Sequence, residues 1–296
     1  MRKFLPLLLA LLLPAAPAWA KIKVIASITP LKSITESVGG DLVEVTSIAR
    51  GNEDPHFVEV RPSFMMSIRS AKLYVSIGMS LDFWARPLIE NARSSGDLQI
   101  VNCSTGIHVL GAPTERVTAR LGDVHPEGNP HYWVDPYNVP IIVKNILTGL
   151  VAVDPDNAAK YQQNAKAFLE QLKKADEGWQ KELAPYAGVK AITFHESWEY
   201  FAEHFKIDVR GQVEPKPGIP PSGSHTQEII NLVKREKIPL IIQEPYYPDA
   251  APKLIAEQTG AKVVKLIQLC DGAPGTSSYI DMMNYNVNKL AEALKK

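Results

Sequence analysis

Short apolar runs of strand length alternate with segments of helical periodicity along most of this 296-residue chain. This order of elements predicts parallel sheets with helices on both faces, which places the chain in the α/β class. In the first half we predict strands at 23–27, 42–48, 73–77 and 98–101, and helices at 31–38, 62–70 and 82–92.

One long amphipathic segment interrupts the alternation. Between residues 157 and 183, apolar or aromatic side chains recur every three or four positions, at Tyr161, Ala165, Phe168, Leu172, Ala175, Trp179 and Leu183. The stripe predicts a helix of about 28 residues, roughly 40 Å long. A coiled-coil segment for dimerisation is the alternative, but the stripe mixes Ala with Tyr and Trp and lasts only about four heptads. We interpret it as a helix that links two lobes.

The strand and helix alternation then resumes. We predict strands at 189–194, 240–243 and 263–266 and a Pro/Gly-rich loop at 214–223. We also predict helices at 196–205 and 224–236, a helix that ends before Gly260, and a last helix at 279–294. Ser224 and Gln227 form a predicted capping box for the second of these helices. The predicted fold is thus α/β, with two βα lobes that contain parallel sheets joined by a long α-helix.

The N-terminus has the pattern of an export signal. Arg2 and Lys3 are followed by an apolar stretch at 5–13, and Ala18-Trp19-Ala20 is a cleavage signature. We expect cleavage after Ala20; an uncleaved N-terminal anchor is the alternative. No cysteine follows the cut and no later run reads as a membrane helix. We therefore expect a secreted, periplasmic protein without a lipid anchor.

The charge of the chain limits the classes of molecule that it can bind, and its two cysteines allow three states. The chain has 32 basic and 32 acidic residues and no basic run, which excludes nucleic acid and anionic lipid as expected partners. A small neutral or cationic ligand fits better. For Cys103 and Cys270 we favour two unpaired, mostly buried thiols, then a disulfide, and last a metal thiolate at Cys270.

Four side chains in four separate loops have the chemistry of a metal site. His56, His131, His195 and Asp271 each follow a short apolar run, two of them in each half of the chain. Open α/β sheets bind ligands beyond the carboxyl ends of their strands. Imidazole nitrogens and a carboxylate suit a tetrahedral divalent transition metal, and nitrogen-rich donors favour Zn²⁺ over Mn²⁺. The pattern predicts one ion held between two lobes.

The remaining histidines lack this placement. His204 lies nine residues beyond His195 on the same predicted helix, too far along it to share an ion. His225 lies in the capping turn, and His108 follows no comparable run. His125 precedes His131 in a loop, where it can at most deliver metal transiently.

Several stretches resemble a known family. They are 53–59 (EDPHFVE), 129–136 (NPHYWVDP), 194–201 (FHESWEYF), 242–244 (IQE), 256–260 (AEQTG) and Asp271 followed by 279–286 (YIDMMNYN). These resemble, in the same order, motifs of the periplasmic zinc and manganese solute-binding proteins of ABC transporters, the cluster A-I metal-binding family. The likeness covers the whole chain after the export signal.

The resemblance implies two βα lobes, a rigid linking helix and one metal bound by residues that match His56, His131, His195 and Asp271. Members that favour manganese often have a glutamate at the third position, so His195 favours zinc. Two departures stand out. The segment 109–130 has only His125, Asp123, Glu115 and Glu127 where many zinc members have a histidine-rich loop, and Val60 replaces a proline after Glu59. Glu59 is a candidate hydrogen-bond partner of a ligand.

We therefore expect a carrier that captures Zn²⁺ and delivers it to an ABC transporter permease in the inner membrane. Manganese or iron(II) is the alternative cargo within the same transporter class. A zinc hydrolase is the rival function, because His195-Glu196 begins an HExxH pattern, but residue 199 is Glu199 and not histidine. A surface adhesion protein is a third class.

The expected organisation is a signal peptide at 1–20, an N-terminal metal-binding lobe at 21–154, a linking helix at 155–185 and a C-terminal metal-binding lobe at 186–296. We expect a monomer and not an enzyme. The sequence leaves open whether a periplasmic metallochaperone loads the site.

Overall fold

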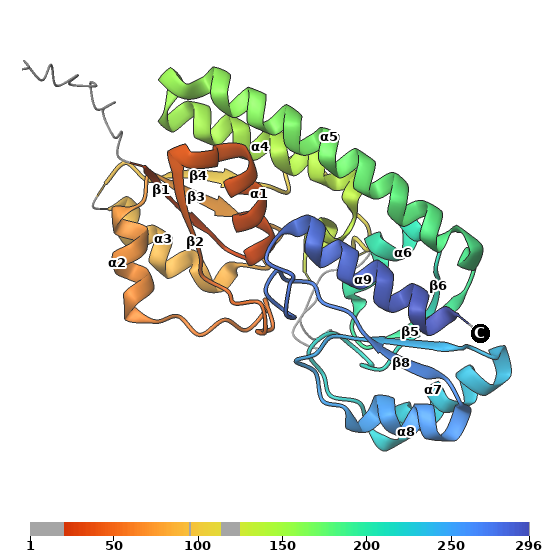
Figure 1. The fold of residues 1–296 in the computed structure, drawn as a ribbon. Coiled ribbons are helices and arrows are strands. Elements are labelled where there is room, and N and C mark those ends of the chain that lie inside the picture. The colour runs from red at the N-terminus through yellow and green to blue at the C-terminus, as the bar shows by residue number, and fades with distance from the viewer. Residues whose placement is uncertain (1–20, 95, 114–124, 296) are drawn as a thin grey trace, which may run out of the picture.

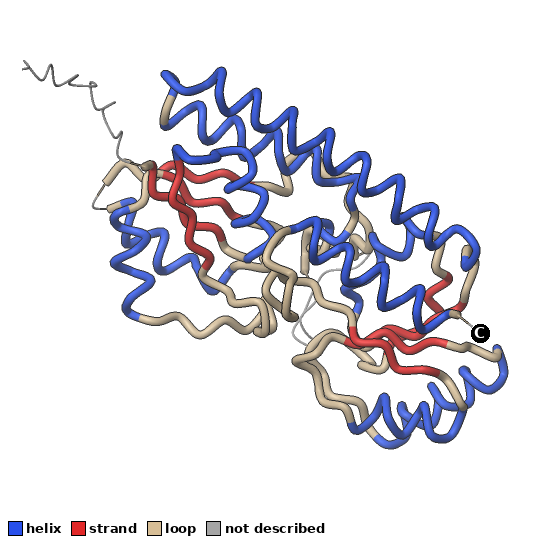
Figure 2. Tube along the Cα trace, in the orientation of Figure 1, coloured by secondary structure: helices blue, strands red, loops and turns tan. Residues whose placement is uncertain are grey.

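A computed structural model describes residues 21–94, 96–113 and 125–295. The predicted signal peptide at 1–20, as well as Glu115 and Asp123, lie outside the described residues. The described chain contains two four-stranded parallel sheets, with their connecting loops gathered between them (Figure 2). The α/β class and the two parallel sheets are confirmed.

The first sheet has the strand order β2-β1-β3-β4 and is entirely parallel. Its elements lie within two residues of the predicted bounds, apart from the start of α3. The strands are β1 (Ile22–Ala26), β2 (Val43–Ser47), β3 (Leu73–Ser76) and β4 (Gln99–Asn102), and the helices are α1 (Thr29–Gly39), α2 (Pro62–Ser70) and α3 (Arg86–Arg93). A 3-10 helix at Phe83–Ala85 precedes α3, which explains why the predicted helix began earlier.

The second sheet repeats this topology with the order β6-β5-β7-β8. Its strands are β5 (Lys190–Thr193), β6 (Asp208–Gln212), β7 (Leu240–Gln243) and β8 (Lys262–Lys265), and its helices are α6 (Glu199–Phe205), α7 (Gly223–Glu236), α8 (Ala250–Thr259) and α9 (Tyr279–Leu294). Helices α7 and α8 cover one face, and α9 lies on the other, toward the long helix (Figure 1).

Two local predictions were incomplete. Strand β6 was missed because its sequence, DVRGQ, has no apolar run and forms a partly exposed edge of the sheet. The cap of α7 is Ser222 and not Ser224: the Ser222 hydroxyl accepts a hydrogen bond from the His225 N–H at 3.2 Å. Ser222 has the extended backbone that an N-cap requires, whereas Ser224 already lies inside the helix.

Helix α4 (Val139–Val153) was also not predicted, and it corrects the expectation about membrane helices. Within the described residues, Pro136–Val153 is long and apolar enough to cross a membrane by length and composition. Its buried side chains include Ile142 and Ile146, and the helix packs against helices α1 and α5 and strand β4. The segment is thus accounted for as a core helix.

The long linking helix is α5 (Ala158–Leu183), with 26 residues. It runs beside both sheets and contacts α1 and α4 at one end and α9 at the other (Figure 1). Six of the seven side chains of the predicted stripe are buried, and Ala175 is partly buried against the same core. Near its C-terminal end, the Trp179 indole donates a hydrogen bond to Asn284 of α9 at 2.7 Å.

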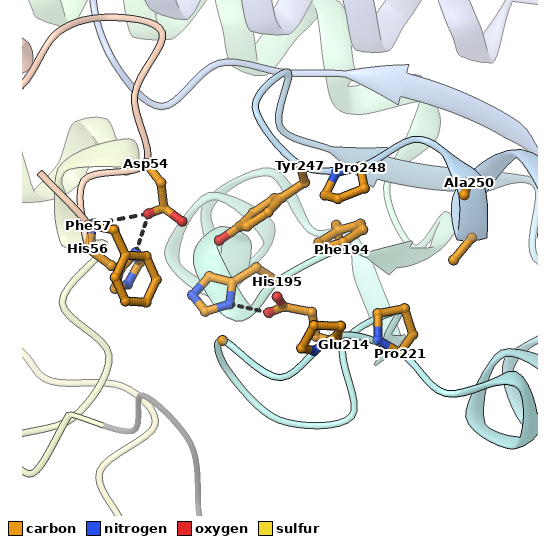
Figure 3. Close-up of a pocket in the computed structure, with 13 residues that line it drawn as sticks. Asp54, His56, Phe57, Phe194, His195, Glu214, Pro221, Tyr247, Pro248 and Ala250 are labelled. Atoms are coloured by element: carbon orange, nitrogen blue, oxygen red, sulfur yellow. Dashed lines mark hydrogen bonds and ion pairs between the residues drawn. The ribbon is translucent and has the colours of Figure 1, made fainter.

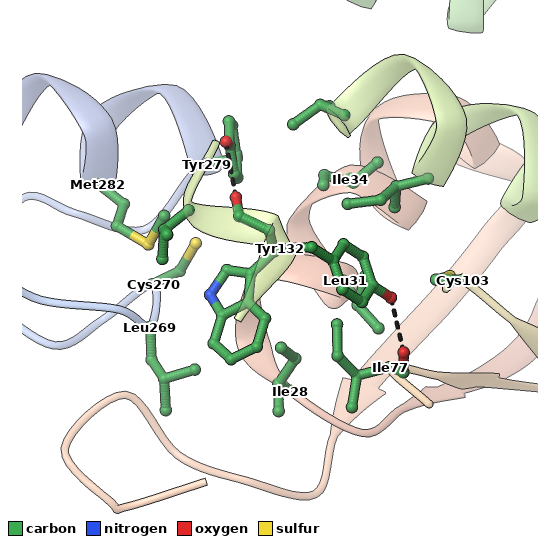
Figure 4. Packing of buried hydrophobic residues seen from close by; sticks show 14 of the residues in the cluster. Ile28, Leu31, Ile34, Ile77, Cys103, Tyr132, Leu269, Cys270, Tyr279 and Met282 are labelled. Atoms are coloured by element: carbon green, nitrogen blue, oxygen red, sulfur yellow. Dashed lines mark hydrogen bonds between the residues drawn. The ribbon is translucent and has the colours of Figure 1, made fainter. Parts of the chain in front are cut away.

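A smaller apolar cluster, which includes Ile230 and Ile241, lies within the second half of the chain. The larger apolar cluster extends through both sheets. It includes Leu31 of α1, Tyr132, and Tyr279 and Met282 of α9 (Figure 4). Hydrogen bonds cross the same region: the Tyr279 hydroxyl donates to the Trp133 carbonyl at 2.8 Å, and the Trp133 indole donates to the Gln268 carbonyl at 2.7 Å. The two halves are therefore packed together and not joined only by a strand of chain.

Both cysteines lie in this core and do not pair. Cys103 and Cys270 are buried and unpaired, and they lie apart in Figure 4. Burial raises the pKa of each thiol far above its ordinary value. The favoured interpretation, two unpaired buried thiols, is confirmed.

Two partly buried ion pairs of His204 attach α6 to the rest of the molecule. His204 donates from Nδ1 to Asp135 at 2.9 Å and from Nε2 to Asp176 of α5 at 2.7 Å. Burial alone would lower its pKa, but the two carboxylates outweigh burial and raise the pKa of His204 to about 9. Both ring nitrogens are occupied, as expected for a histidine outside the metal site.

This arrangement predicts a pH-dependent stability. Because the folded-state pKa is raised, protonated His204 stabilises the fold fully below the ordinary pKa of about 6.5, and the contribution is lost as the pH rises through about 9. His204→Gln should lower the melting temperature at pH 6 by several degrees and have a smaller effect at pH 9.5. Thermal denaturation in a chelator, with the exposed His108→Gln as control, measures this. An equal loss at both pH values would contradict it.

Candidate metal centre

Three histidines from distant parts of the chain converge between the two sheets. His56 lies in the loop after β2, His131 directly before a 3-10 helix at Tyr132–Val134, and His195 two residues after the end of β5. Their ligand atoms lie within 4.8 Å of one another. The ring centroids are 5.0 Å apart for His56 and His131, 5.0 Å for His56 and His195, and 5.3 Å for His131 and His195.

Local hydrogen bonds hold each of the three loops. Asp54 accepts from the backbone N–H of His56 at 3.0 Å, and Asn129 accepts from that of His131 at 2.9 Å. These are Asx turns, in which an Asp or Asn side chain bonds the backbone two residues on. His195 is placed by the sheet instead, because the N–H of Phe194 donates to the Ile242 carbonyl at 2.7 Å.

An oxygen also holds the Nδ1 atom of each ring. His131 Nδ1 pairs with the Asn129 carbonyl oxygen at 2.8 Å. His56 Nδ1 pairs with Asp54 and His195 Nδ1 with Glu214, both at 2.8 Å (Figure 3). The Asn129 amide nitrogen donates to the Glu196 carbonyl at 2.7 Å, which fixes its oxygen toward His131. Because these oxygens accept, each Nδ1 carries the proton and each Nε2 keeps a free lone pair.

The Nε2 atoms then face a common point. Those of His56 and His131 are buried and have no hydrogen-bond partner among the described residues. Buried polar atoms without a partner destabilise the fold and are uncommon, unless a ligand or ion supplies the partner. Three converging imidazole lone pairs fit a divalent transition metal such as zinc.

The electrostatic environment differs between the rings. Burial lowers the pKa of His131 well below its ordinary value, and the neighbouring histidines lower it further, so this ring is neutral at pH 7. Burial also acts to lower the pKa of His195, but the hydrogen bond to Glu214 and the nearby charge of Glu244 outweigh it, so that pKa is raised. Burial acts to raise the pKa of Asp54, but its hydrogen bond to His56 outweighs burial and lowers it.

A buried carboxyl group lies behind His195. Glu244 follows β7 and accepts hydrogen bonds from the Ser197 hydroxyl at 2.5 Å and the Gln268 amide at 2.6 Å. Burial raises the pKa of Glu244 to about 7, although its hydrogen bonds and the charge of His195 oppose this. Glu244 therefore contributes to the charge balance around the histidines without being one of the converging groups.

A cleft of about 350 Å³ opens beside His56 and His195. Its walls are mostly apolar, with Phe57, Phe194 and Tyr247 around the two histidines (Figure 3). Apolar walls exclude water from the ligand atoms and strengthen electrostatic interactions there. The cleft connects the candidate site to the outside of the protein between the two lobes.

The fourth predicted ligand, Asp271, is not part of this group, so its assignment is corrected. Its side chain is exposed, and its backbone has a φ of 61°. Its N–H donates to the Thr276 carbonyl at 2.8 Å, and its own carbonyl packs so closely on Gly51 that a side chain there would clash. This turn is fixed by backbone contacts, and it directs the carboxylate to solvent.

Sequence reasoning also missed the partners of the rings. Glu59 was the candidate, but it is exposed, and Asp54, Asn129 and Glu214 have that role. Two of these were visible in the sequence as the repeated pattern Asp-Pro-His and Asn-Pro-His. Glu214 lies 19 residues beyond His195 and had no local signal. Of the other histidines, His108 is exposed, and His225 pairs with the Gln212 carbonyl at 3.1 Å.

The chain has two parallel βα lobes, the linking helix α5 and a cluster of imidazoles between the lobes. These features define a class of proteins, the metal-binding solute-binding proteins of uptake systems. Residues 24–293 match the family model described as zinc-uptake complex component A periplasmic, and the chain belongs to that family. It is therefore a metal-binding periplasmic component of an ABC transporter and not an enzyme, and a membrane permease is its partner.

Individual relatives differ in the metal that they are named for. The chain is 26% identical to the iron-binding protein YfeA of Yersinia pestis, over 92% of this chain and 86% of that protein. It is 24% identical to the manganese ABC transporter substrate-binding lipoprotein PsaA of Streptococcus anginosus, over 95% and 92%. A crystal structure of ZnuA has 27% identity and a TM-score of 0.78, with 92% of this chain and 99% of that chain covered.

The hydrogen bonds of the rings predict distinct titrations. In protein without metal, His195 should titrate above about 6.5, and His131 should remain neutral well below that pH. Glu214→Gln keeps an oxygen acceptor but removes the charge, so it should lower the pKa of His195. NMR of ¹⁵N-labelled histidine measures both values, with the exposed Glu228→Gln as control. An unchanged His195 titration in Glu214→Gln would argue against this pairing.

Proposed function

We propose that His56, His131 and His195 bind one Zn²⁺ ion through their Nε2 atoms, and that this ion is the cargo of the transporter. The convergence of the three ligand atoms within 4.8 Å supports the proposal most directly. The oxygens on the Nδ1 atoms add to it, because such partners fix ring orientation and increase the basicity of the metal-binding nitrogen.

Zinc is favoured by the chemistry of the donors. Imidazole nitrogens suit Zn²⁺, whereas Mn²⁺ prefers carboxylate and other oxygen ligands. The carboxylates of Asp54 and Glu214 lie behind two of the rings, so they offset the charge of a divalent ion without binding it. Manganese or iron(II) remains the alternative cargo, because relatives are named for both metals.

Delivery requires release to the permease. The continuous core and α5 oppose rotation of one lobe against the other, so we expect little hinge motion on binding. Release then depends on a change in the ligand loops when the protein docks, which favours the metal-free state. A periplasmic metallochaperone that loads the site is compatible with the cleft between the lobes.

We further propose that residues 1–20 are cleaved, that lobes at 21–154 and 186–296 flank a linking helix at 155–185, and that the mature protein is a monomer without a lipid anchor. Some relatives are named lipoproteins. The two cysteines of this chain are Cys103 and Cys270, both buried in the core.

Metal analysis of protein purified without added metal, followed by competition among Zn²⁺, Mn²⁺ and Fe²⁺, tests the proposal. We expect zinc to bind most tightly. His195→Ala should lower zinc affinity by roughly tenfold or more, because one of three donors is lost. The exposed His108→Ala serves as control. An unchanged dissociation constant for His195→Ala in titration calorimetry would reject the site.

Zinc affinity should also depend on pH. A histidine must lose its proton to bind metal, and the raised pKa of His195 makes protons compete already above about pH 6.5. Affinity should therefore fall steadily as the pH decreases from 8 to 6. Competition titrations with a chelator of known affinity at each pH measure the trend. A constant affinity over this range would show that the histidines are not the donors.

A further inference from the structure

We infer that His125 supplies a fourth donor to the ion proposed for His56, His131 and His195. The inference rests on the proposed function and deepens it, because it names the residue that completes the coordination shell. His125 was expected only to deliver metal transiently, and Asp271 was expected in the fourth position. In the structure, the His125 ring lies beside that of His56, whereas Asp271 lies outside the histidine group.

The first support is position. The His125 ring centroid lies 5.4 Å from that of His56, close to the 5.0 to 5.3 Å that separates the three converging rings. His125 also lines a small cavity of about 30 Å³ together with His131, His195 and Asn129. This space matches about one water molecule or one ion. The cavity thus brings His125 to the same space as two of the proposed ligands.

The second support is a turn that ties His125 to the His131 loop. The Gly128 N–H donates to the His125 carbonyl at 3.1 Å, and the Asn129 N–H donates to the Leu110 carbonyl at 2.9 Å. Gly128 has a φ of 107°, and an added Cβ would lie 2.3 Å from a methyl group of Val109, so only glycine fits there. Within the turn, Glu127 accepts a hydrogen bond from Ser80 at 2.8 Å.

These contacts fix the backbone position of His125, so that only its side chain has to rotate. The group within 4.8 Å has three members, so a nitrogen of His125 must approach by rotation of its side chain when the ion binds. The ring is half-buried and lies beside His56, which makes this a short movement.

The third support is the chemistry of the donors in the coordination shell of the zinc ion. A tetrahedral zinc site needs four donors, and three histidines leave one position open. A fourth imidazole fills it with a neutral nitrogen donor and adds no further negative charge to a site that already has Asp54 and Glu214 behind its rings. Four nitrogens without a carboxylate oxygen disfavour Mn²⁺, so His125 acts as a determinant of specificity.

The test uses Co²⁺ as a spectroscopic probe of the zinc site, in the full mature protein. Tetrahedral Co²⁺ gives intense visible absorption, which shifts when one donor is replaced and weakens when the coordination number rises above four. His125→Ala should weaken or shift these bands and lower zinc affinity on the order of tenfold, while manganese affinity changes little. His108→Ala, in the same part of the chain, is the matched control.

A second measurement does not depend on a variant. X-ray absorption of the zinc-loaded wild-type protein counts imidazole ligands, and we expect four. Three imidazoles plus one oxygen would overturn the inference and assign the fourth position to water or to a small molecule in the adjacent cleft. If His195→Ala abolishes tight binding but His125→Ala leaves affinity and spectrum unchanged, only the His125 inference fails. If neither variant has an effect, the proposed function itself fails.

Discussion

The apolar core shared by the two lobes is the constraint on which the candidate metal centre depends. His56 and His131 lie in loops of the first half of the chain, whereas His195 follows the first strand of the second sheet. These loops are far apart in the sequence, and the Asn129 amide, which donates to the Glu196 carbonyl at 2.7 Å, links the His131 loop to the His195 loop. They meet because α5 and α9 pack the carboxyl ends of both sheets toward each other, and because hydrogen bonds such as that from Trp133 to Gln268 cross the core.

Within this packed structure, hydrogen bonds set the orientation of the three imidazole rings of His56, His131 and His195. The oxygens of Asp54, Asn129 and Glu214 hold the three Nδ1 atoms, so that the Nε2 lone pairs point to one place before any ligand arrives. Such preorganisation reduces the cost of ordering the donors on binding. Two of the three oxygens are carboxylates, and they balance the charge of a cation from behind the rings, where they do not compete for it.

Much of the fold could be predicted from the sequence, because buried apolar residues recur with the period of the helix or strand that contains them. Most strand and helix bounds lay within two residues of the prediction, and the stripe from Tyr161 to Leu183 predicted the linking helix. Strand β6 was missed because an edge strand can be polar. The three histidines were recognisable as residues that follow strands. Asp271 also followed a strand, but a backbone turn against Gly51 directs it to solvent, which no spacing in the sequence indicates.

The sequence by itself determined the class of fold, the linking helix and the family, and it identified the three candidate histidines, since these depend on periodicity and on motifs within a few residues. Only the tertiary structure decided which donors meet. Glu214 reaches His195 from 19 residues away, His125 lies beside His56, and Asp271 lies outside the group. The physical reason is that coordination needs atoms placed within a few tenths of an ångström, and that placement depends on how two separate sheets pack.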